Sequence, residues 1–364
     1  MADRAGDYEW REEGEEAEIV FYAPEKSVLG LPRLRLGVHA AARLPGVESP
    51  VYAAASGSGY GWVAASRSHA APGLISPPRL GLLLTADVPL DRLGAPDELQ
   101  SRFFRDLSEV PLPNLGGYSA RAAAEWGGLW AAEEGFVEEE DLPFFPARRG
   151  DPEAVGRRAL TAGVREWDPR LAAGEVHLMR VGEVLDPEGA EALGLEPGVL
   201  AVVADVGSGE LGRRALEGHR ARVSDREFDA PEGLSAAPAD TEEAEDLLHA
   251  SQASANYVSV RAALFLYALC RALGGVAGSL TARASWSIGG LEERGVLLLH
   301  RRGLAALGAG EVLAAGETVA AARGGMLGSA PPFGAGEDGE RWPWEEAGLL
   351  ERRVALEPLA GGER

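Results

Sequence analysis

Hydrophobic positions in the first quarter of the chain fall in short runs separated by glycine, proline and serine. One such run covers residues 17–22, and several more lie within residues 31–92. Short runs bounded by turn-forming residues are typical of β-strands joined by tight turns. Residues 93–170 instead have a helical pattern that is interrupted by loops. We therefore expect strands first and broken helices next.

Strand and helix patterns alternate in the middle of the chain. The apolar runs at 177–181 and 200–204 predict strands, and residues 187–193 predict a short helix that ends at Gly194. Residues 229–240 are rich in proline, alanine and aspartate, which predicts an internal loop.

The longest helical pattern covers residues 240–273. Asp240 begins it, and Glu243 follows at the spacing of an N-terminal capping box. Strand patterns return within residues 280–327, and residues 331–343 predict a loop-like tail segment. This mixture predicts an α+β fold with a substantial β-sheet.

Size and hydrophobic content allow one large domain. The chain has 364 residues, of which 46% are hydrophobic, and this is enough for an extensive core. We interpret residues 1–30 as an acidic N-terminal lead-in and residues 31–364 as a single domain. Cys270 is the only cysteine, so an intrachain disulfide and a cysteine-rich metal site are excluded.

The net charge of −22 bears on possible partners. An acidic surface repels phosphate backbones unless a local basic patch overrides the average. The alternative reading is that the charge only favours solubility. The chain begins with polar and acidic residues and has no run of about 18 apolar residues, so we expect neither a secretion signal nor a membrane span. We expect a cytoplasmic protein.

Seven segments, in order, resemble the RtcB-type RNA ligases. They are residues 42–47, 59–61, 74–81, 194–212, 255–257, 300–303 and 356–359. The best match is an apolar strand followed by Gly207-Ser208-Gly209, where the family reads H-T-G-S-R-x-L-G. The resemblance covers roughly residues 40–364. It implies an RtcB-like fold, with β-sheet layers around a central cleft and peripheral helices.

The family joins a 3′-phosphate RNA end to a 5′-hydroxyl end with GTP and two Mn²⁺ ions, and a histidine carries GMP covalently. Most of the residues that this chemistry needs are replaced here. In the segment that resembles the second metal motif, Leu83 stands for the aspartate and Ala86 for the cysteine. The first motif, near residues 54–61, has lost its aspartate and histidine. The histidine that carries GMP has no counterpart, since no histidine follows His300.

Two metal ligands of the family have possible remnants. His177 matches a ligand histidine, and Asp205 replaces another. They could form a residual metal or phosphate site, or His177 could be a buried histidine with a hydrogen-bonded partner. Two ligands are too few for a stable Mn²⁺ site. The resemblance therefore implies no cofactor, or Mn²⁺ and GTP if the family activity persists.

Four further residues are candidates for binding phosphate. Ser208 lies in a glycine-rich turn whose backbone N–H groups could hold an anion, although a plain strand-to-helix turn fits the same pattern. His300, Arg301 and Arg302 resemble the family's H-R-K-G and could contact phosphate. The alternative for these residues is an ordinary basic surface pair.

Three functional hypotheses follow from the resemblance. The first is a catalytically inactive RtcB homologue that acts as a binding, regulatory or scaffold protein and contacts RNA or RNA-repair proteins. The second is an enzyme, either a diverged RNA ligase or another phosphate-ester enzyme with a rebuilt site. The third is a structural protein that forms homo-oligomers.

Overall fold

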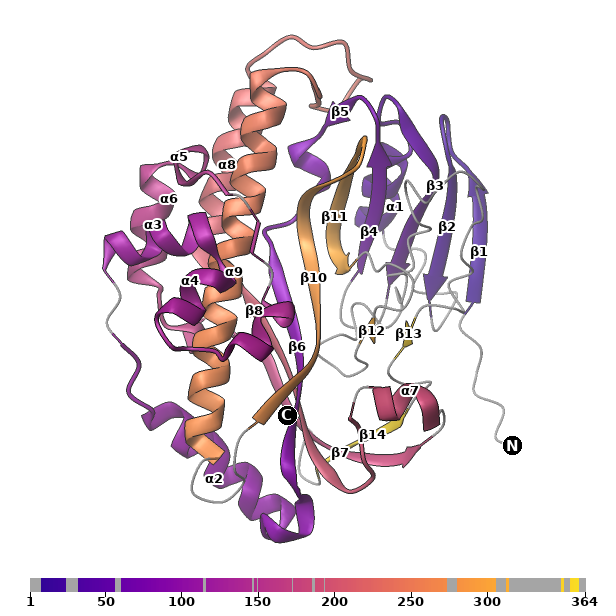
Figure 1. The fold of residues 1–364 in the computed structure, drawn as a ribbon. Coiled ribbons are helices and arrows are strands. Elements are labelled where there is room, and N and C mark those ends of the chain that lie inside the picture. The colour runs from indigo at the N-terminus through magenta and orange to yellow at the C-terminus, as the bar shows by residue number, and fades with distance from the viewer. Residues whose placement is uncertain are drawn as a thin grey trace.

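A large mixed β-sheet with helices packed against it forms the molecule (Figure 1). The structure is a computed structural model. It describes residues 8–23, 32–55, 60–113, 116–145, 147–148, 150–171, 173–184, 187–192, 194–273, 280–305, 312–313, 348–349 and 354–359. The α+β class predicted from the sequence is confirmed. The division into a lead-in and one domain stays a prediction.

The main sheet has ten strands. In spatial order they are β1 (Tyr8–Glu13), β2 (Glu18–Ala23), β3 (Val47–Ala55), β4 (Tyr60–Ser66), β11 (Leu297–Ala305), β10 (Leu280–Arg294), β6 (Arg79–Pro89), β8 (Val199–Gly207), β7 (Ala173–Val184) and β14 (Val354–Pro358). Only β2 and β3 run parallel, and the other neighbours are antiparallel. Two small pairs join β5 (His69–Ala70) to β9 (Ala237–Pro238), and β12 (Val312–Leu313) to β13 (Gly348–Leu349).

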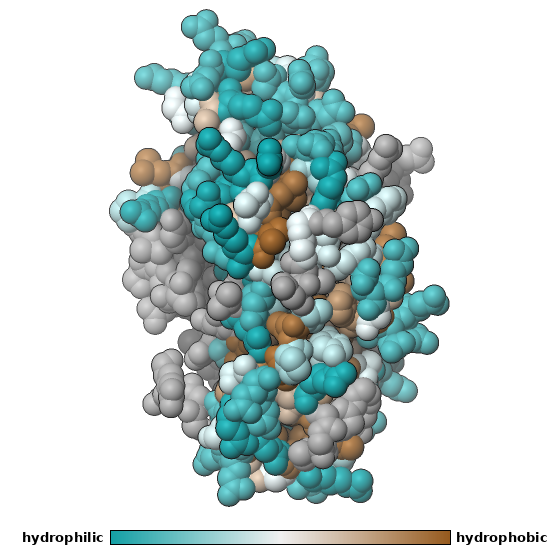
Figure 2. Space-filling view, turned by 90° about the vertical axis from the view of Figure 1, so that its left-hand side faces the viewer, coloured by the Kyte–Doolittle hydropathy of each residue, from teal (hydrophilic) through white to brown (hydrophobic). Residues whose placement is uncertain are grey.

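The helices belong to two groups. Beside the central strands lie α2 (Pro96–Glu109), α3 (Gly117–Trp126), α4 (Gly128–Glu133), α5 (Pro152–Val155), α6 (Arg157–Arg165), α8 (Gly209–Ser224) and α9 (Glu242–Leu273) (Figure 1). Helix α1 (Pro32–Ala41) packs on β3 and β4, and α7 (Pro187–Ala192) lies between β7 and β8 in the chain. The outer surface of the first group is mostly hydrophilic, with small apolar areas between the polar side chains (Figure 2).

Helix α9 is the centre of the main core. Strand residues alternate between the two faces of a sheet, so Leu80, Leu82 and Leu84 of β6 all reach the helix side. They pack with apolar residues of α9 and of β8 in one buried cluster. Helix α9 is long and apolar enough to cross a membrane, but 83% of its most apolar stretch is buried inside the protein.

The sequence pattern located most of these elements. Strands β2, β7, β8 and β11, the helices of residues 93–170, α7 and α9 occur where they were predicted. The predicted loop at 229–240 contains only the two-residue strand β9. Residues 314–327 of the region predicted to form strands, and the predicted tail segment at 331–343, lie outside the described residues.

Two sequence predictions were wrong, one for residues 32–41 and one for the N-terminal cap of α9. Residues 32–41 were expected among the strands but form α1, because Leu34, Val38 and Ala41 recur at helical spacing and bury one side. Helix α9 begins at Glu242, and its cap is Thr241, whose Oγ1 accepts a hydrogen bond from the Ala244 N–H at 3.4 Å. Strand β1 was not predicted.

Candidate functional site

A two-pronged ion pair holds the aspartate that was predicted as a remnant metal ligand. Asp205 lies on β8 opposite Gly81 of β6, and its side chain is buried. Arg79, at the start of β6, donates from Nε to Oδ1 at 3.0 Å and from Nη2 to Oδ2 at 2.5 Å. Charge-assisted pairs with two parallel bonds are the strong ones among hydrogen bonds. A guanidinium therefore holds both oxygens of this carboxylate.

His177 lies on the same face of the sheet as Asp205. It pairs with Val203 across β7 and β8, and Val203 and Asp205 are two residues apart on β8. Residues that are paired in antiparallel strands, or two apart along one strand, point to the same face. The two predicted remnant ligands are thus neighbours on one surface of the sheet.

The positions where the family has its other ligands carry apolar side chains. Leu83 is paired with Val203, and Ala86 packs in the main core beside α9. Within the described residues, no three His, Cys, Asp or Glu side chains are grouped closely enough to hold an ion. A leucine and a methyl group donate no electron pair, and Asp205 already binds a cation. The described donor set therefore does not fit two Mn²⁺ ions.

A second charge cluster surrounds the buried carboxylate of Glu292 on β10. Arg148 Nη2 donates to its Oε1 at 2.5 Å, and Arg294 Nε donates to the same oxygen at 3.2 Å. Arg301 Nη2 lies 2.7 Å from Oε2, and both side chains of this pair are buried. Burial alone would raise the pKa of Glu292, but the three guanidinium groups outweigh it and lower the pKa to about 2. Three cations and one anion leave a net charge of +2.

One small cleft lies between α9 and the strands β6, β10 and β11, and its walls include Arg79, Arg148 and Arg301. We call it the arginine cleft. The guanidinium of Arg79 is bonded to Asp205 on the sheet face opposite α9, so Arg148 and Arg301 supply the charge on the α9 side. The other polar walls of the cleft come from α9 and β10: Ser251, Gln252, Asn256, Ser259 and Ser287. Its inner cavity measures about 20 Å³, which is the space of about one water molecule, so a larger group would contact the mouth of the cleft and not its interior. Arg148 is about one-third exposed, so part of its side chain faces solvent at the mouth of the cleft.

Asn256 fixes the backbone at Arg148. Its Nδ2 group faces the carbonyl oxygens of Ala124, Glu125 and Arg148 at 3.1, 3.1 and 2.5 Å. Its Oδ1 accepts a hydrogen bond from the Arg148 N–H at 2.9 Å. The sequence comparison singled out Asn256 only as part of a matching segment. In the structure it joins α3 and the loop after Phe145 to α9.

His300, Arg301 and Arg302 were predicted together as phosphate-binding residues, but they do not face the same site. His300 is fully buried: Nε2 accepts from the Ala71 N–H at 2.9 Å, and Nδ1 faces the Leu298 carbonyl at 3.2 Å. Burial lowers the pKa of His300 to about 4, so the ring is neutral near pH 7 and both nitrogens are occupied. Arg302 lies over the ring of Trp62, 5.0 Å from its centre. Only Arg301 reaches the arginine cleft.

Ser208 is the residue that precedes α8, and it forms a strand-to-helix turn. Its N–H donates to the Pro78 carbonyl at 3.0 Å, and its hydroxyl is buried without a hydrogen-bond partner. A methyl group on Gly212 would lie 2.1 Å from this hydroxyl, so the turn packs tightly against its own helix. Ser208 is thus buried at the turn and does not face a groove.

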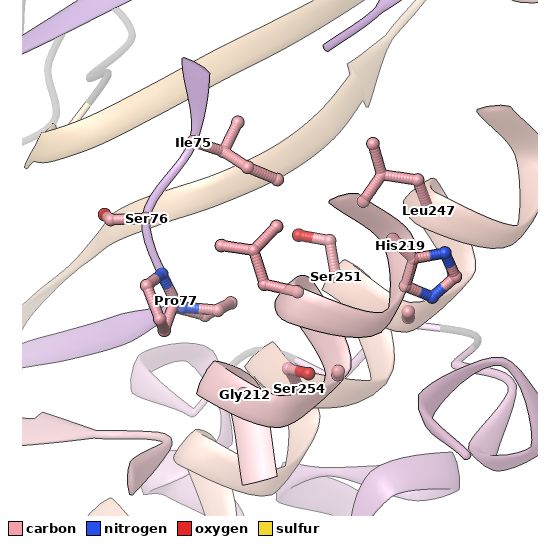
Figure 3. Close-up of a pocket in the computed structure, with 12 residues that line it drawn as sticks. Ile75, Ser76, Pro77, Gly212, His219, Leu247, Ser251 and Ser254 are labelled. Atoms are coloured by element: carbon pink, nitrogen blue, oxygen red, sulfur yellow. The ribbon is translucent and has the colours of Figure 1, made fainter. Parts of the chain in front are cut away.

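A neighbouring cavity between α8, α9 and residues 75–78 is too small to be a ligand site. Its volume is about 10 Å³, and its walls include Ile75, Leu247 and the small residues Gly212, Ser251 and Ser254 (Figure 3). His219 lies at its edge, and its Nε2 is 2.9 Å from the Ala154 carbonyl oxygen. Such a space holds at most one water molecule.

Sequence reasoning missed Arg79, Arg148 and Glu292. Arg79 and Asp205 are 126 positions apart, and Arg148 and Glu292 are 144 positions apart. No local spacing links such pairs. Nor did the sequence indicate that Glu292 and Arg301 are buried, because each is adjacent to other charged residues, Glu293 and Arg302.

Comparison with known proteins gives a partial match. No protein-family model matches the chain. The chain is 30% identical over 148 residues to the tRNA-splicing ligase RtcB of Pyrococcus horikoshii. The match covers 36% of this chain and 16% of that protein. The chain is thus similar to a segment of an RNA ligase and spans about one sixth of that protein's length.

Proposed function

From this partial relationship, we propose that the protein is an RtcB-like homologue that binds RNA ends without joining them. The observation that carries the proposal is the Arg79–Asp205 pair. Asp205 stands where the family has a ligand histidine, and a guanidinium holds both of its oxygens. An organic cation bonded to the protein thus takes the place of a metal ion.

The arginine cleft supplies the binding chemistry for this function. A terminal phosphate carries about −1.5 to −2 charges near pH 7 and three acceptor oxygens. Guanidinium groups match that geometry with paired N–H donors and never lose their charge. The net charge of +2 around Glu292 therefore favours a phosphate even though the whole protein is acidic. The protein would act as a binding, regulatory or scaffold partner of RNA or of RNA-repair proteins in the cytoplasm.

The RtcB-like architecture, with sheet layers around a central cleft, is part of the same proposal. The ten-stranded sheet, the helix layer and the partial sequence match support it. The alternative function is a diverged ligase that uses Mn²⁺ and GTP. It would need ligands and a nucleotide-carrying residue at positions other than those that the family uses.

Transfer of GMP to the protein separates the two functions. The purified chain is incubated with Mn²⁺ and GTP labelled at the α-phosphate, then denatured and resolved on a gel. We expect no retained label and no stoichiometric Mn²⁺ after desalting, because the described donors do not fit the ions. The RtcB of Pyrococcus horikoshii, treated identically, is the positive control. A covalent label, or two ions per chain, would overturn this proposal in favour of the diverged ligase.

A further inference from the structure

An open groove between α6 and α8 carries four arginines on the helix side of the molecule. Arg157, Arg158 and Arg165 come from α6, and Arg214 comes from α8. The groove has a volume of about 570 Å³ and is far larger than the arginine cleft. We call it the α6–α8 groove. It contrasts with the net charge of −22 over the whole chain.

Three of the four arginines in this groove form no ion pair with the described residues. Arg214 pairs with Glu210 at 2.8 Å, and Glu166 accepts a hydrogen bond from the Glu210 N–H at 3.0 Å. In the part of the chain that the structure describes, Arg157, Arg158 and Arg165 have no carboxylate within 4.0 Å. Four arginines and two glutamates give the groove a net charge of +2.

The shape and composition of the groove favour a nucleic-acid backbone over a protein. Positions 157, 161 and 165 are four residues apart, so their side chains follow one line with a rise of about 6 Å per step. Ala162 is the only apolar wall residue. Protein partners need buried aromatic or aliphatic anchors, and this groove offers no pocket for one. Arginine and threonine side chains are among the usual contacts to phosphate and sugar.

We infer that the α6–α8 groove binds the phosphate backbone of single-stranded RNA, as a contact separate from the terminal phosphate in the arginine cleft. The inference rests on the proposed function, since it takes RNA as the ligand. Unlike the cleft, the groove reads no RNA end and no base. Its contribution to affinity is therefore electrostatic and independent of sequence.

The test replaces the three unpaired arginines with glutamine (R157Q/R158Q/R165Q). The probe is a fluorescent single-stranded RNA with a 3′-hydroxyl, and anisotropy gives its Kd at several salt concentrations. We expect at least tenfold weaker binding at low salt. Three lost phosphate contacts should also reduce the slope of log K against log salt by about 2. Circular dichroism confirms that the variant is folded.

The control removes the same charge elsewhere, in R92Q/R105Q/R226Q. These three arginines are exposed and lie outside the groove. The control should keep most of the affinity and the salt slope. Equal weakening of both variants, or no effect in the groove variant, would overturn the inference. Displacement of the RNA by polyglutamate at equal charge concentration would also overturn it, because an acidic protein would then fit the groove as well.

A second probe separates this inference from the proposed function. The same RNA with a 3′-phosphate should bind more tightly than the 3′-hydroxyl form, and the groove variant should keep that ratio. If the wild-type chain binds neither RNA, both proposals fail. If it prefers the 3′-phosphate and the groove variant matches the control, only the groove proposal fails.

Discussion

Replacing Glu292 with glutamine should destabilise the protein by about 3 kcal/mol at pH 7, which is the free-energy equivalent of its lowered pKa. The pKa is about 2 in the folded state, against a normal value of 4.5. The folded state therefore favours the charged carboxylate. Its stabilisation is complete above pH 4.5 and is lost as the pH falls towards 2. Glutamine leaves Arg148 and Arg301 without their anion.

Urea unfolding of both proteins at pH 7 and pH 3 measures this effect. The stability difference between wild type and E292Q should be large at pH 7 and should shrink at pH 3, because the wild-type carboxylate takes up a proton on unfolding there. E293Q is the matched control, since Glu293 is the exposed neighbour of Glu292. It should change stability by less than about 0.5 kcal/mol. A cost for E292Q that equals that of E293Q, or that stays constant with pH, would refute the role of the cluster.

The second large effect is expected at Arg261, a fully buried arginine in the middle of α9. Its Nη1 donates to the Gly207 carbonyl at 2.7 Å and its Nη2 donates to the Asp168 carbonyl at 2.9 Å. Burial lowers the pKa of Arg261. The guanidinium also lies over the ring of Tyr257, 5.8 Å from its centre. It thereby ties the end of β8 and the segment before Arg170 to the central helix.

Methionine at position 261 keeps much of the aliphatic volume but leaves two buried carbonyl groups without a donor. Each unsatisfied group costs about 1–3 kcal/mol, and relief from burying the charge offsets part of this cost. We expect R261M to lose about 3 kcal/mol in urea unfolding. R271M, an exposed position on the same helix with its own aromatic contact to Tyr267, should lose less than about 1 kcal/mol. A variant R261M as stable as R271M would contradict this account.

The parts of the fold that the sequence predicted are those with local signals. Strand β8 begins with a continuous apolar run at residues 199–204, and it is buried along nearly its whole length. Helix α9 has a long apolar pattern that begins near a capping residue. Helix α1 has equally regular spacing, but its glycine and proline neighbours favoured the interpretation as strands and turns.

The site could be predicted only in part, because its contacts depend on strand order. Strand β6 lies between β10 and β8, although both follow it by more than a hundred residues. This order brings Arg79 to Asp205. The resemblance pointed to Asp205 and Arg301, but it could not give their charged partners. The resemblance also could not show that His300 is buried. His300 and Arg301 are adjacent in β11, and adjacent strand residues point to opposite faces of the sheet, so only Arg301 faces the cleft.

Binding of 3′-phosphate RNA in the presence of EDTA tests the central claim most directly, namely that arginines replace the metal ions. Anisotropy titrations of the wild-type chain are run in EDTA and in Mn²⁺, with R148Q and the exposed control R105Q alongside. We predict equal affinity in EDTA and in Mn²⁺, a preference for 3′-phosphate over 3′-hydroxyl RNA, and loss of that preference in R148Q alone. Binding that requires Mn²⁺, or an R148Q variant that keeps the preference, would contradict the account.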